Sequence, residues 1–186
     1  MAIVGVSGSG KSTLLHSLSS FLAPDSGEIL YNNTDLYKAT EESMLAIRRH
    51  DFGIIFQSHY LFSGFSGREN IQVSSLLAHE PIDEELIKHF SLDHVIHQNV
   101  GTLSGGQQQR LSIARVLTKK PKILFADEPT GNLDKKTADE IMNLLFDYLK
   151  HVNGSLFLVT HDHDLAQRCD TSLRLHDKKL KSETWM

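Results

Sequence analysis

The sequence predicts an α/β protein in which a mostly parallel sheet is flanked by helices. Four short runs, at residues 2–4, 53–56, 123–126 and 156–159, are continuously apolar, as in strands covered on both faces of a parallel sheet. Segments with helical periodicity separate these runs, and such alternation is typical of the class. The third observation is a glycine-rich stretch, GVSGSGKST at residues 5–13, placed where the first strand would turn into a helix.

The length of 186 residues fits a single domain, which we expect to span residues 1–186. Residues 1–57 and 121–186 are expected to form the sheet core, and about 58–120 an inserted helical subdomain. Hydrophobic residues make up 40% and charged residues 23%, which is ordinary for soluble globular proteins. A formal net charge of -4 provides no basic field for a phosphate backbone, so no nucleic acid is expected as a partner.

The helices in the first half of the chain follow from periodicity and capping. A helix through residues 14–18 is expected directly after the glycine loop, with leucines on one face. The polar, His-rich stretch 58–102 contains Ser66-Gly67-Arg68-Glu69, which matches a capping box, and another helix is expected after Asp83. This stretch is the predicted insertion in the sheet domain.

Two further helices are predicted in the second half. Ser104 and Gln107 form a capping box at the start of one of them. The clearest helix follows Asp134, a suitable N-cap, and ends near Asn153-Gly154. Its apolar face comprises Ile141, Leu144, Leu145, Tyr148 and Leu149.

The glycine-rich stretch has the spacing of a phosphate loop, G-x-x-x-x-G-K-[ST], and lies between a strand and a helix as that motif requires. Its backbone N–H groups can turn inward around phosphate oxygens, and the helix N-terminus adds a favourable dipole. Lys11 would neutralise the β- and γ-phosphates, and Ser12 would offer a hydroxyl to Mg²⁺. The predicted nucleotide-binding residues of the loop are Gly5, Ser7, Gly8, Ser9, Gly10, Lys11, Ser12 and Thr13.

Two other segments carry candidate chemistry. The apolar run 123–126 ends in Asp127 and Glu128, which would hold Mg²⁺ through water and lie next to the γ-phosphate, respectively. By itself such a pair is commonly a solvated turn, but the phosphate loop favours the catalytic interpretation. Gly105 and Gly106 remove side chains from a helix entrance, which suits the close approach of an anion.

With these motifs in this order, the chain closely resembles the ATPase subunit of ABC (ATP-binding cassette) transporters over almost its whole length. Five segments match: the phosphate loop, Gln57 as the Q-loop glutamine, residues 103–107 as the signature, the pair Asp127-Glu128, and His161 as the switch histidine. The resemblance implies a P-loop NTPase (RecA-like) fold with ATP and Mg²⁺ as cofactors. Residues 126–134, ADEPTGNLD, look like the subgroup of lipoprotein-releasing, macrolide-export and cell-division ATPases.

The same resemblance implies roles for individual residues. Glu128 would be the general base, assisted by His161 and Lys11 at the γ-phosphate, and Gln57 would join Ser12 and Asp127 at Mg²⁺. The resemblance implies a head-to-tail dimer, either a homodimer or a dimer with another ABC subunit. In it the cap of one subunit would close over the ATP held by the other, and Asp134 would communicate between the two sites. The residues of that cap are Ser104, Gly105, Gly106 and Gln107.

The family works with an integral membrane permease, so the resemblance implies a cytoplasmic protein, peripheral on the inner or plasma membrane. Phe62 and Phe65 follow Gln57, where the family docks its membrane subunit, although a buried core position explains them equally well. Trp185 is expected to pack locally.

One departure from the family pattern concerns the N-terminal region. Family members usually carry an antiparallel edge sheet before the phosphate loop, with an aromatic that stacks on adenine. Here no aromatic precedes Gly5, and Tyr31 is in the wrong place for that role. We therefore expect an uncovered sheet edge, and two explanations are open: Met1 is an internal methionine of a longer reading frame, or the chain is naturally truncated.

Two alternatives to a transporter ATPase are therefore open. One is a nucleotide-binding module with weak or no turnover, and the other is a soluble ABC ATPase that acts on nucleic acid or ribosomes. A small-molecule P-loop kinase would have no use for residues 103–107.

Overall fold

The computed structural model describes residues 1–183, so Trp185 lies outside the described residues. Its main sheet confirms the predicted mostly parallel arrangement, because every neighbouring pair except the last is parallel. In spatial order the strands are β4 (Phe52–Ile55), β5 (Ile123–Asp127), β6 (Ser155–Thr160), β1 (Ala2–Val4), β7 (Ser172–His176) and β8 (Lys179–Ser182).

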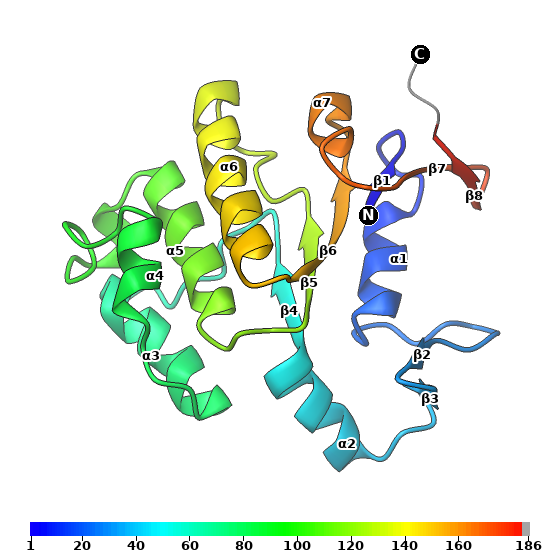
Figure 1. Ribbon diagram of the computed structural model, residues 1–186, viewed down its shortest axis with the longest axis horizontal. Coiled ribbons are helices and arrows are strands. Elements are labelled where there is room, and N and C mark those ends of the chain that lie inside the picture. The colour runs from blue at the N-terminus through cyan, green and yellow to red at the C-terminus, as the bar shows by residue number, and fades with distance from the viewer. Residues whose placement is uncertain (184–186) are drawn as a thin grey trace.

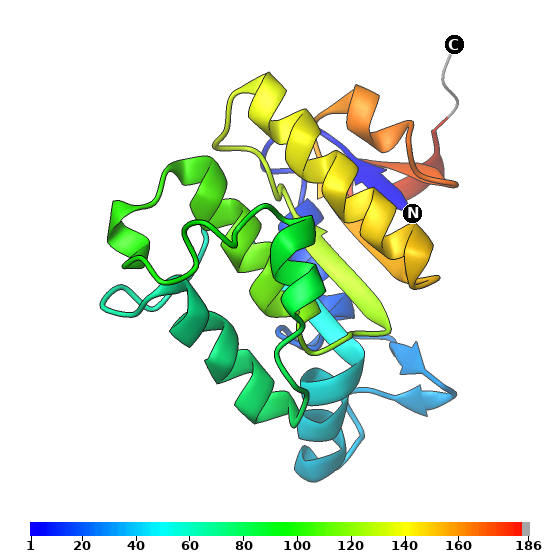
Figure 2. The same ribbon diagram turned by 60° about the vertical axis from the view of Figure 1, so that its left-hand side comes forward.

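Helices cover both faces of this sheet, and Figures 1 and 2 place α3, α4 and α5 together at its β4 edge, away from β8. The helical elements are α1 (Lys11–Leu18), α2 (Glu41–Ala46), the π-helical turn η1 (Ile47–Asp51), α3 (Gly67–Ala78), α4 (Glu84–His89), the 3₁₀ turn η2 (Val100–Thr102), α5 (Gly105–Leu117), α6 (Lys135–His151) and α7 (His163–Ala166).

Successive residues of the central strands enter two different hydrophobic clusters. Ala2 and Val4 of β1 belong to the cluster with α5, α6 and α7, whereas Ile3 belongs to the cluster with α1. Leu158 and Val159 of β6 divide in the same way. Because both faces are buried, both alternating positions must be apolar, which explains the continuous apolar runs in the sequence.

The predicted caps are present. Ser66 and Glu69 form a reciprocal capping box at the start of α3, and the Asp83 carboxylate accepts two backbone N–H bonds at the start of α4. The Asp134 side chain caps α6, which ends at His151 just before Asn153, a residue with a φ of 51°. Capping depends on residues close in sequence, so these helix ends were predictable.

Several strands were not predicted. β2 (Leu30–Tyr31) and β3 (Thr34–Asp35) form a small hairpin, and its turn residues Asn32 and Asn33 have φ values of 49° and 63°. Asparagine tolerates positive φ, so the Asn-Asn pair is the sequence signal for this turn. β7 alternates leucine with polar residues and β8 carries two lysines, so neither contains a continuous apolar run.

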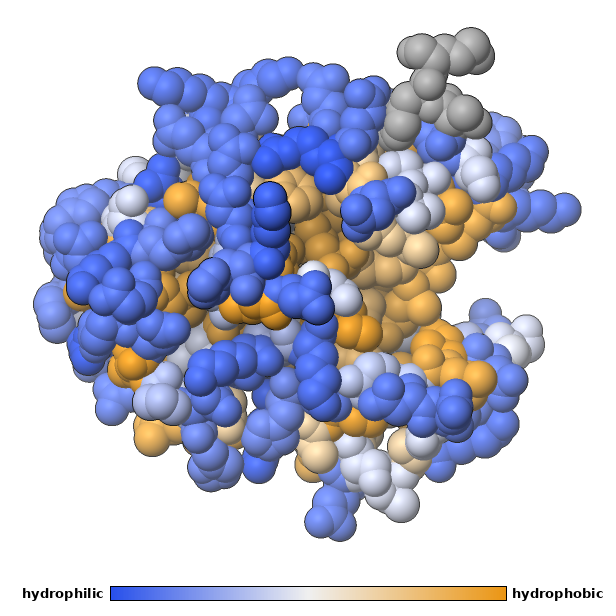
Figure 3. All heavy atoms as spheres, viewed as in Figure 1, coloured by the Kyte–Doolittle hydropathy of each residue, from blue (hydrophilic) through white to orange (hydrophobic). Residues whose placement is uncertain are grey.

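Part of the surface beside β8 is apolar. Figure 3 shows hydrophobic atoms gathered in the hollow between the β8 end of the molecule and the β2–β3 hairpin. Leu30 on β2 and Leu180 on β8 are exposed, whereas the Tyr31 ring packs edge-on against Phe52 at a centroid distance of 5.0 Å. Tyr31 is therefore part of the packing around Phe52.

Candidate nucleotide-binding site

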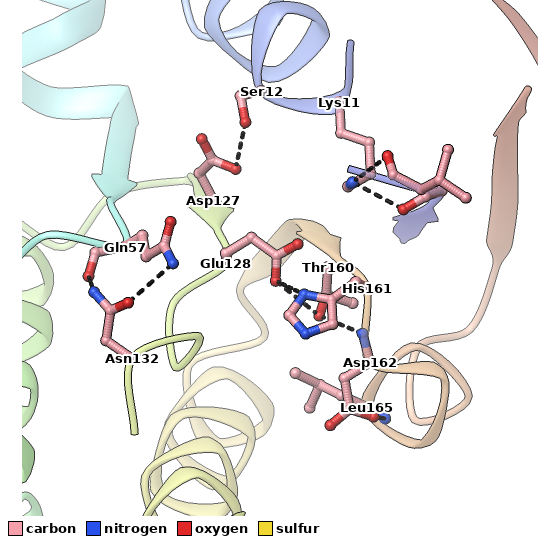
Figure 4. A network of polar contacts seen from close by, with 12 residues as sticks. Lys11, Ser12, Gln57, Asp127, Glu128, Asn132, Thr160, His161, Asp162 and Leu165 are labelled. Carbon is pink, nitrogen blue, oxygen red and sulfur yellow. Dashed lines mark hydrogen bonds and ion pairs between the residues drawn. The ribbon is translucent and has the colours of Figure 1, made fainter. Parts of the chain in front are cut away.

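The loop between β1 and α1 forms a concave backbone surface at the end of the central strand. Gly10 is the N-cap of α1 and has a φ of 99°, a left-handed conformation that a residue with a Cβ rarely adopts. Lys11 follows it and is 7% exposed, and its Nζ donates to the carbonyl oxygens of Gly5 at 2.9 Å and Val6 at 3.1 Å (Figure 4). The Ser9 hydroxyl in the same loop is buried and has no hydrogen-bond partner within residues 1–183. A buried cation, an unsatisfied hydroxyl and a helix N-terminus together fit a phosphate chain.

A cavity of about 550 Å³ opens over this loop. Its size suits a small-molecule ligand. It lies at the carboxyl ends of β1, β4, β5 and β6, the edge where parallel α/β sheets bind their ligands. The residues that line it are Ser7, Gly8, Gly10, Lys11, Ser12, Thr13, Gln57, Glu128 and His161.

Asp127 is the last residue of β5 and lies beside the phosphate loop. Its Oδ1 accepts a hydrogen bond of 3.0 Å from the Ser12 hydroxyl (Figure 4). Its Oδ2 lies 3.8 Å from His16 Nε2. Two hard oxygen donors from segments 115 residues apart are thus placed side by side.

Glu128 adopts an unusual backbone conformation, with a φ of 46°. Such values are uncommon for residues other than glycine and cluster at functional sites. The Glu128 amide donates to the Val159 carbonyl at 2.9 Å, which ties the strained residue to β6. The Glu128 Oε2 lies 2.8 Å from His161 Nδ1 and accepts from the Thr160 hydroxyl at 3.4 Å. The carboxylate is therefore held at the cavity by two residues from the end of β6.

The signature residues form the N-terminus of α5. The Ser104 hydroxyl accepts from the Gln107 amide at 3.3 Å, and Gln107 Oε1 accepts from the Ser104 amide at 2.9 Å, which confirms the predicted capping box. A Cβ at Gly106 would come within 2.8 Å of Thr137 Cγ2 on α6, so close helix packing also requires glycine there. Among the described residues that line the cavity, none belongs to 104–107.

Asp134 is also placed away from the cavity within this chain. Its Oδ1 accepts from the Thr137 amide at 3.0 Å, and hydrogen bonds from Thr137 hold the pKa of the carboxyl below its ordinary value. Gln57 lines the cavity and hydrogen-bonds to Asn132. The sequence analysis missed Asn132 and Thr160, although both lie within four residues of a predicted site residue.

This fold and cavity define a nucleotide-binding α/β protein of the phosphate-loop class. Comparison with known proteins places it more narrowly. Residues 1–131 match the family model described as ABC transporter. The chain is 38% identical over 187 aligned positions to the lipoprotein-releasing system ATP-binding protein LolD 1 of Rhodopseudomonas palustris, covering 97% of this chain and 83% of that protein.

Solved structures agree. The dimeric structure of MJ0796, a bacterial ABC transporter cassette, matches with a TM-score of 0.86 and 32% identity over 97% of this chain and 82% of that one. A dimeric structure of MJ0796 in a post-hydrolysis state, bound to ADP and Pi, matches with a TM-score of 0.86 and 30% sequence identity. The match covers 100% of this chain and 85% of that chain. The structure of cbiO1 from Clostridium perfringens, part of the ABC transporter complex cbiONQ, matches with a TM-score of 0.85 and 32% sequence identity. The match covers 97% of this chain and 74% of that chain.

The chain belongs to the ABC transporter family, and it is an ATP-binding, ATP-hydrolysing subunit of that family. The helices of residues 1–183 include none that is both long enough and apolar enough to cross a bilayer.

Proposed function

We propose that this ATPase energises a separate membrane subunit by closing a head-to-tail dimer around two ATP molecules. The observation that carries the proposal is the split of its site: the phosphate loop, acids and histidine surround one cavity, whereas the signature lies elsewhere on the same chain. The dimeric MJ0796 structures support closure by a second copy.

Within each site, different residues of the chain bind the phosphates and activate the attacking water. Lys11 and the loop amides bind the phosphates, and the dipole of α1 adds to that attraction. Glu128 is the general base that takes a proton from the attacking water. His161 and Thr160 orient its carboxylate, and His161 can turn its ring toward the γ-phosphate once the nucleotide is present.

Ser12, Asp127 and Gln57 are the proposed Mg²⁺ residues. All three offer oxygen atoms, which Mg²⁺ prefers, and the 3.0 Å contact between Ser12 and Asp127 places two of them together. When bound, Mg²⁺ would neutralise charge on the β- and γ-phosphate oxygens.

Replacement of Asp127 by asparagine is expected to raise the Mg²⁺ concentration for half-maximal phosphate release about tenfold or more, because a neutral amide binds the cation less well. Binding of a fluorescent ATP analogue in EDTA should stay unchanged, since the phosphate loop is intact. Asp147→Asn, on the exposed side of α6, is the matched control. An unchanged Mg²⁺ response would contradict the role given to Asp127.

The surface beside the Q-loop is the proposed docking site for the membrane subunit. Tyr60, Phe62 and Phe65 are 66%, 48% and 43% exposed, so the alternative that Phe62 and Phe65 belong to the buried core is wrong. Next to them a pocket of about 230 Å³ is lined by aromatic rings and by Arg48, Arg115 and Lys119. Burial lowers the pKa of Lys119 to about 8, and an acidic side chain from a partner would offset that cost.

Attachment to the cytoplasmic face of the inner or plasma membrane follows from this docking. LolD 1, by its name, is part of a lipoprotein-releasing system, and cbiO1 is part of a transporter complex. By analogy with these relatives, the cargo site of this transporter would lie on the membrane subunit.

The double variant Phe62→Asp, Phe65→Asp is expected to lower the membrane-bound fraction of the protein about tenfold in its source cells, because aromatic anchors dominate interface energies. Leu180→Asp removes a similarly exposed hydrophobic side chain far from this surface and is the control. Immunoblots of washed membranes and supernatant measure the distribution. Equal distributions for both variants would contradict this docking site.

A further inference from the structure

Two carboxamide side chains face each other beside the cavity. Gln57 lies two residues after the end of β4, and Asn132 lies in the loop between β5 and α6. Gln57 Nε2 donates to Asn132 Oδ1 at 3.1 Å, and Asn132 Nδ2 donates to the Gln57 main-chain oxygen at 3.3 Å (Figure 4). The two bonds join segments 75 residues apart.

The first bond selects one orientation of the Gln57 carboxamide. A carboxamide carries donors on its nitrogen and an acceptor on its oxygen, and Asn132 Oδ1 can only accept. Gln57 must therefore turn its nitrogen toward Asn132, and Figure 4 shows Oε1 pointing away from that residue. Within residues 1–183, Asn132 is the hydrogen-bond partner recorded for the Gln57 side chain.

This orientation matters for a cation. Mg²⁺ binds oxygen and not an amide NH₂, so a flipped Gln57 would present two N–H donors where a ligand is needed. Ser12 and Asp127 are already held by their own hydrogen bond. Among the three proposed Mg²⁺ residues, Gln57 is thus the one whose orientation depends on Asn132.

The second bond acts on the backbone. It ties the start of the loop that carries Tyr60, Phe62 and Phe65 to the loop that leads to Asp134. The former loop is the proposed docking surface. The latter lies next to the signature helix α5, because a Cβ at Gly105 would be 3.6 Å from Leu133 Cδ2. One side chain therefore spans the partner-facing and the dimer-facing loops.

We propose that Asn132 is a positioning residue that presents the side-chain oxygen of Gln57, Oε1, to Mg²⁺. We also propose that it makes the loop after β4 and the loop between β5 and α6 move as one unit. The first part rests on the proposed Mg²⁺ role of Gln57, whereas the second part does not.

Asn132→Ala is expected to raise the Mg²⁺ concentration for half-maximal binding of a fluorescent ATP analogue about three- to tenfold. Of the two hydrogen bonds that it removes, the one from Gln57 Nε2 orients the carboxamide, and the loss of one ordinary hydrogen bond corresponds to that range. Binding in EDTA should not change. In the nucleotide-free protein, hydrogen exchange of peptides covering residues 56–65 should accelerate. Asn143→Ala, on α6, is the matched control, because it removes a single exposed hydrogen bond, the one donated by Arg168.

Asn132→Asp separates the two bonds. Its carboxylate still accepts from Gln57 Nε2 but cannot donate to the main-chain oxygen. We expect its Mg²⁺ response to stay closer to that of the wild type than to that of Asn132→Ala, whereas exchange of residues 56–65 rises as in Asn132→Ala.

An Mg²⁺ response of Asn132→Ala equal to that of the wild type would overturn the orienting role, and unchanged exchange would overturn the link between loops. An equal loss of binding in EDTA would also overturn the orienting role, because it would indicate general damage. A wild-type protein without any Mg²⁺-dependent binding would refute the metal site itself, and the exchange experiment would then still decide on the link.

Discussion

Replacing Glu128 by glutamine is expected to lower steady-state phosphate release by about 10² to 10⁴, the usual contribution of a general base. Glutamine has nearly the same shape as glutamate. Its side-chain carbonyl oxygen can still accept a hydrogen bond from His161, which lies 2.8 Å from the Glu128 carboxylate, so the loop after β5 should keep its structure. It cannot take a proton from water at neutral pH. ATP should therefore stay bound, and the closed dimer should accumulate.

Three measurements separate this outcome from simple damage. Phosphate release gives the rate, size-exclusion chromatography with light scattering gives the oligomeric state in ATP, and thermal unfolding gives stability. Glu140→Gln, which removes only the ion pair with Arg110 on the exposed side of α6, is the control and should behave as the wild type. Equal rates for Glu128→Gln and the wild type would favour a module that binds nucleotide without turning it over.

Substituting Ser104 by aspartate is expected to lower turnover about 10²-fold while the chain still folds. Aspartate is as good an N-cap as serine, so α5 should form normally. Its negative charge would face the triphosphate bound to the second copy and oppose closure. Thr40→Asp is the control, because it likewise replaces a hydroxyl N-cap by aspartate, at the start of α2 and far from the cavity.

Mixing two inactive variants tests whether the site is shared. In a dimer of Glu128→Gln with Ser104→Asp, one site carries both defects and the other carries neither. The mixture should regain up to about a quarter of the wild-type rate if copies exchange freely in a symmetric dimer. A site complete within one chain would give no recovery, and its rate per molecule would not fall on dilution. Either result would refute the proposed composite site.

Much of the local structure was predictable because it depends on residues close in sequence. The phosphate loop needs glycine at fixed spacing, and Gly10, at one of these positions, has a left-handed φ that glycine adopts readily. The capping boxes at Ser66 and Ser104 likewise depend on a partner three residues away. The strands β7 and β8 escaped prediction because neither contains a continuous apolar run.

Side-chain exposure was less predictable. The residue type of Phe62 fits a buried core as well as a docking surface, and its exposure of 48% is known only from the structure. The same holds for Asn132, whose residue type fits many loop positions. Its contact with Gln57 exists because β4 and β5 are neighbours in the sheet, a pairing that the spacing of the motifs does not contain.

The sequence by itself therefore determined the class of fold, the phosphate loop, the acid pair and the family to which the chain belongs, because these depend on spacing and short-range capping. Only the tertiary structure decided which of these groups share a cavity. It brings the carboxyl ends of four parallel strands to one edge, so Lys11, Gln57, Glu128 and His161 meet there. It directs the signature away from that cavity, because the packing of α5 against α6 sets the direction of its N-terminus.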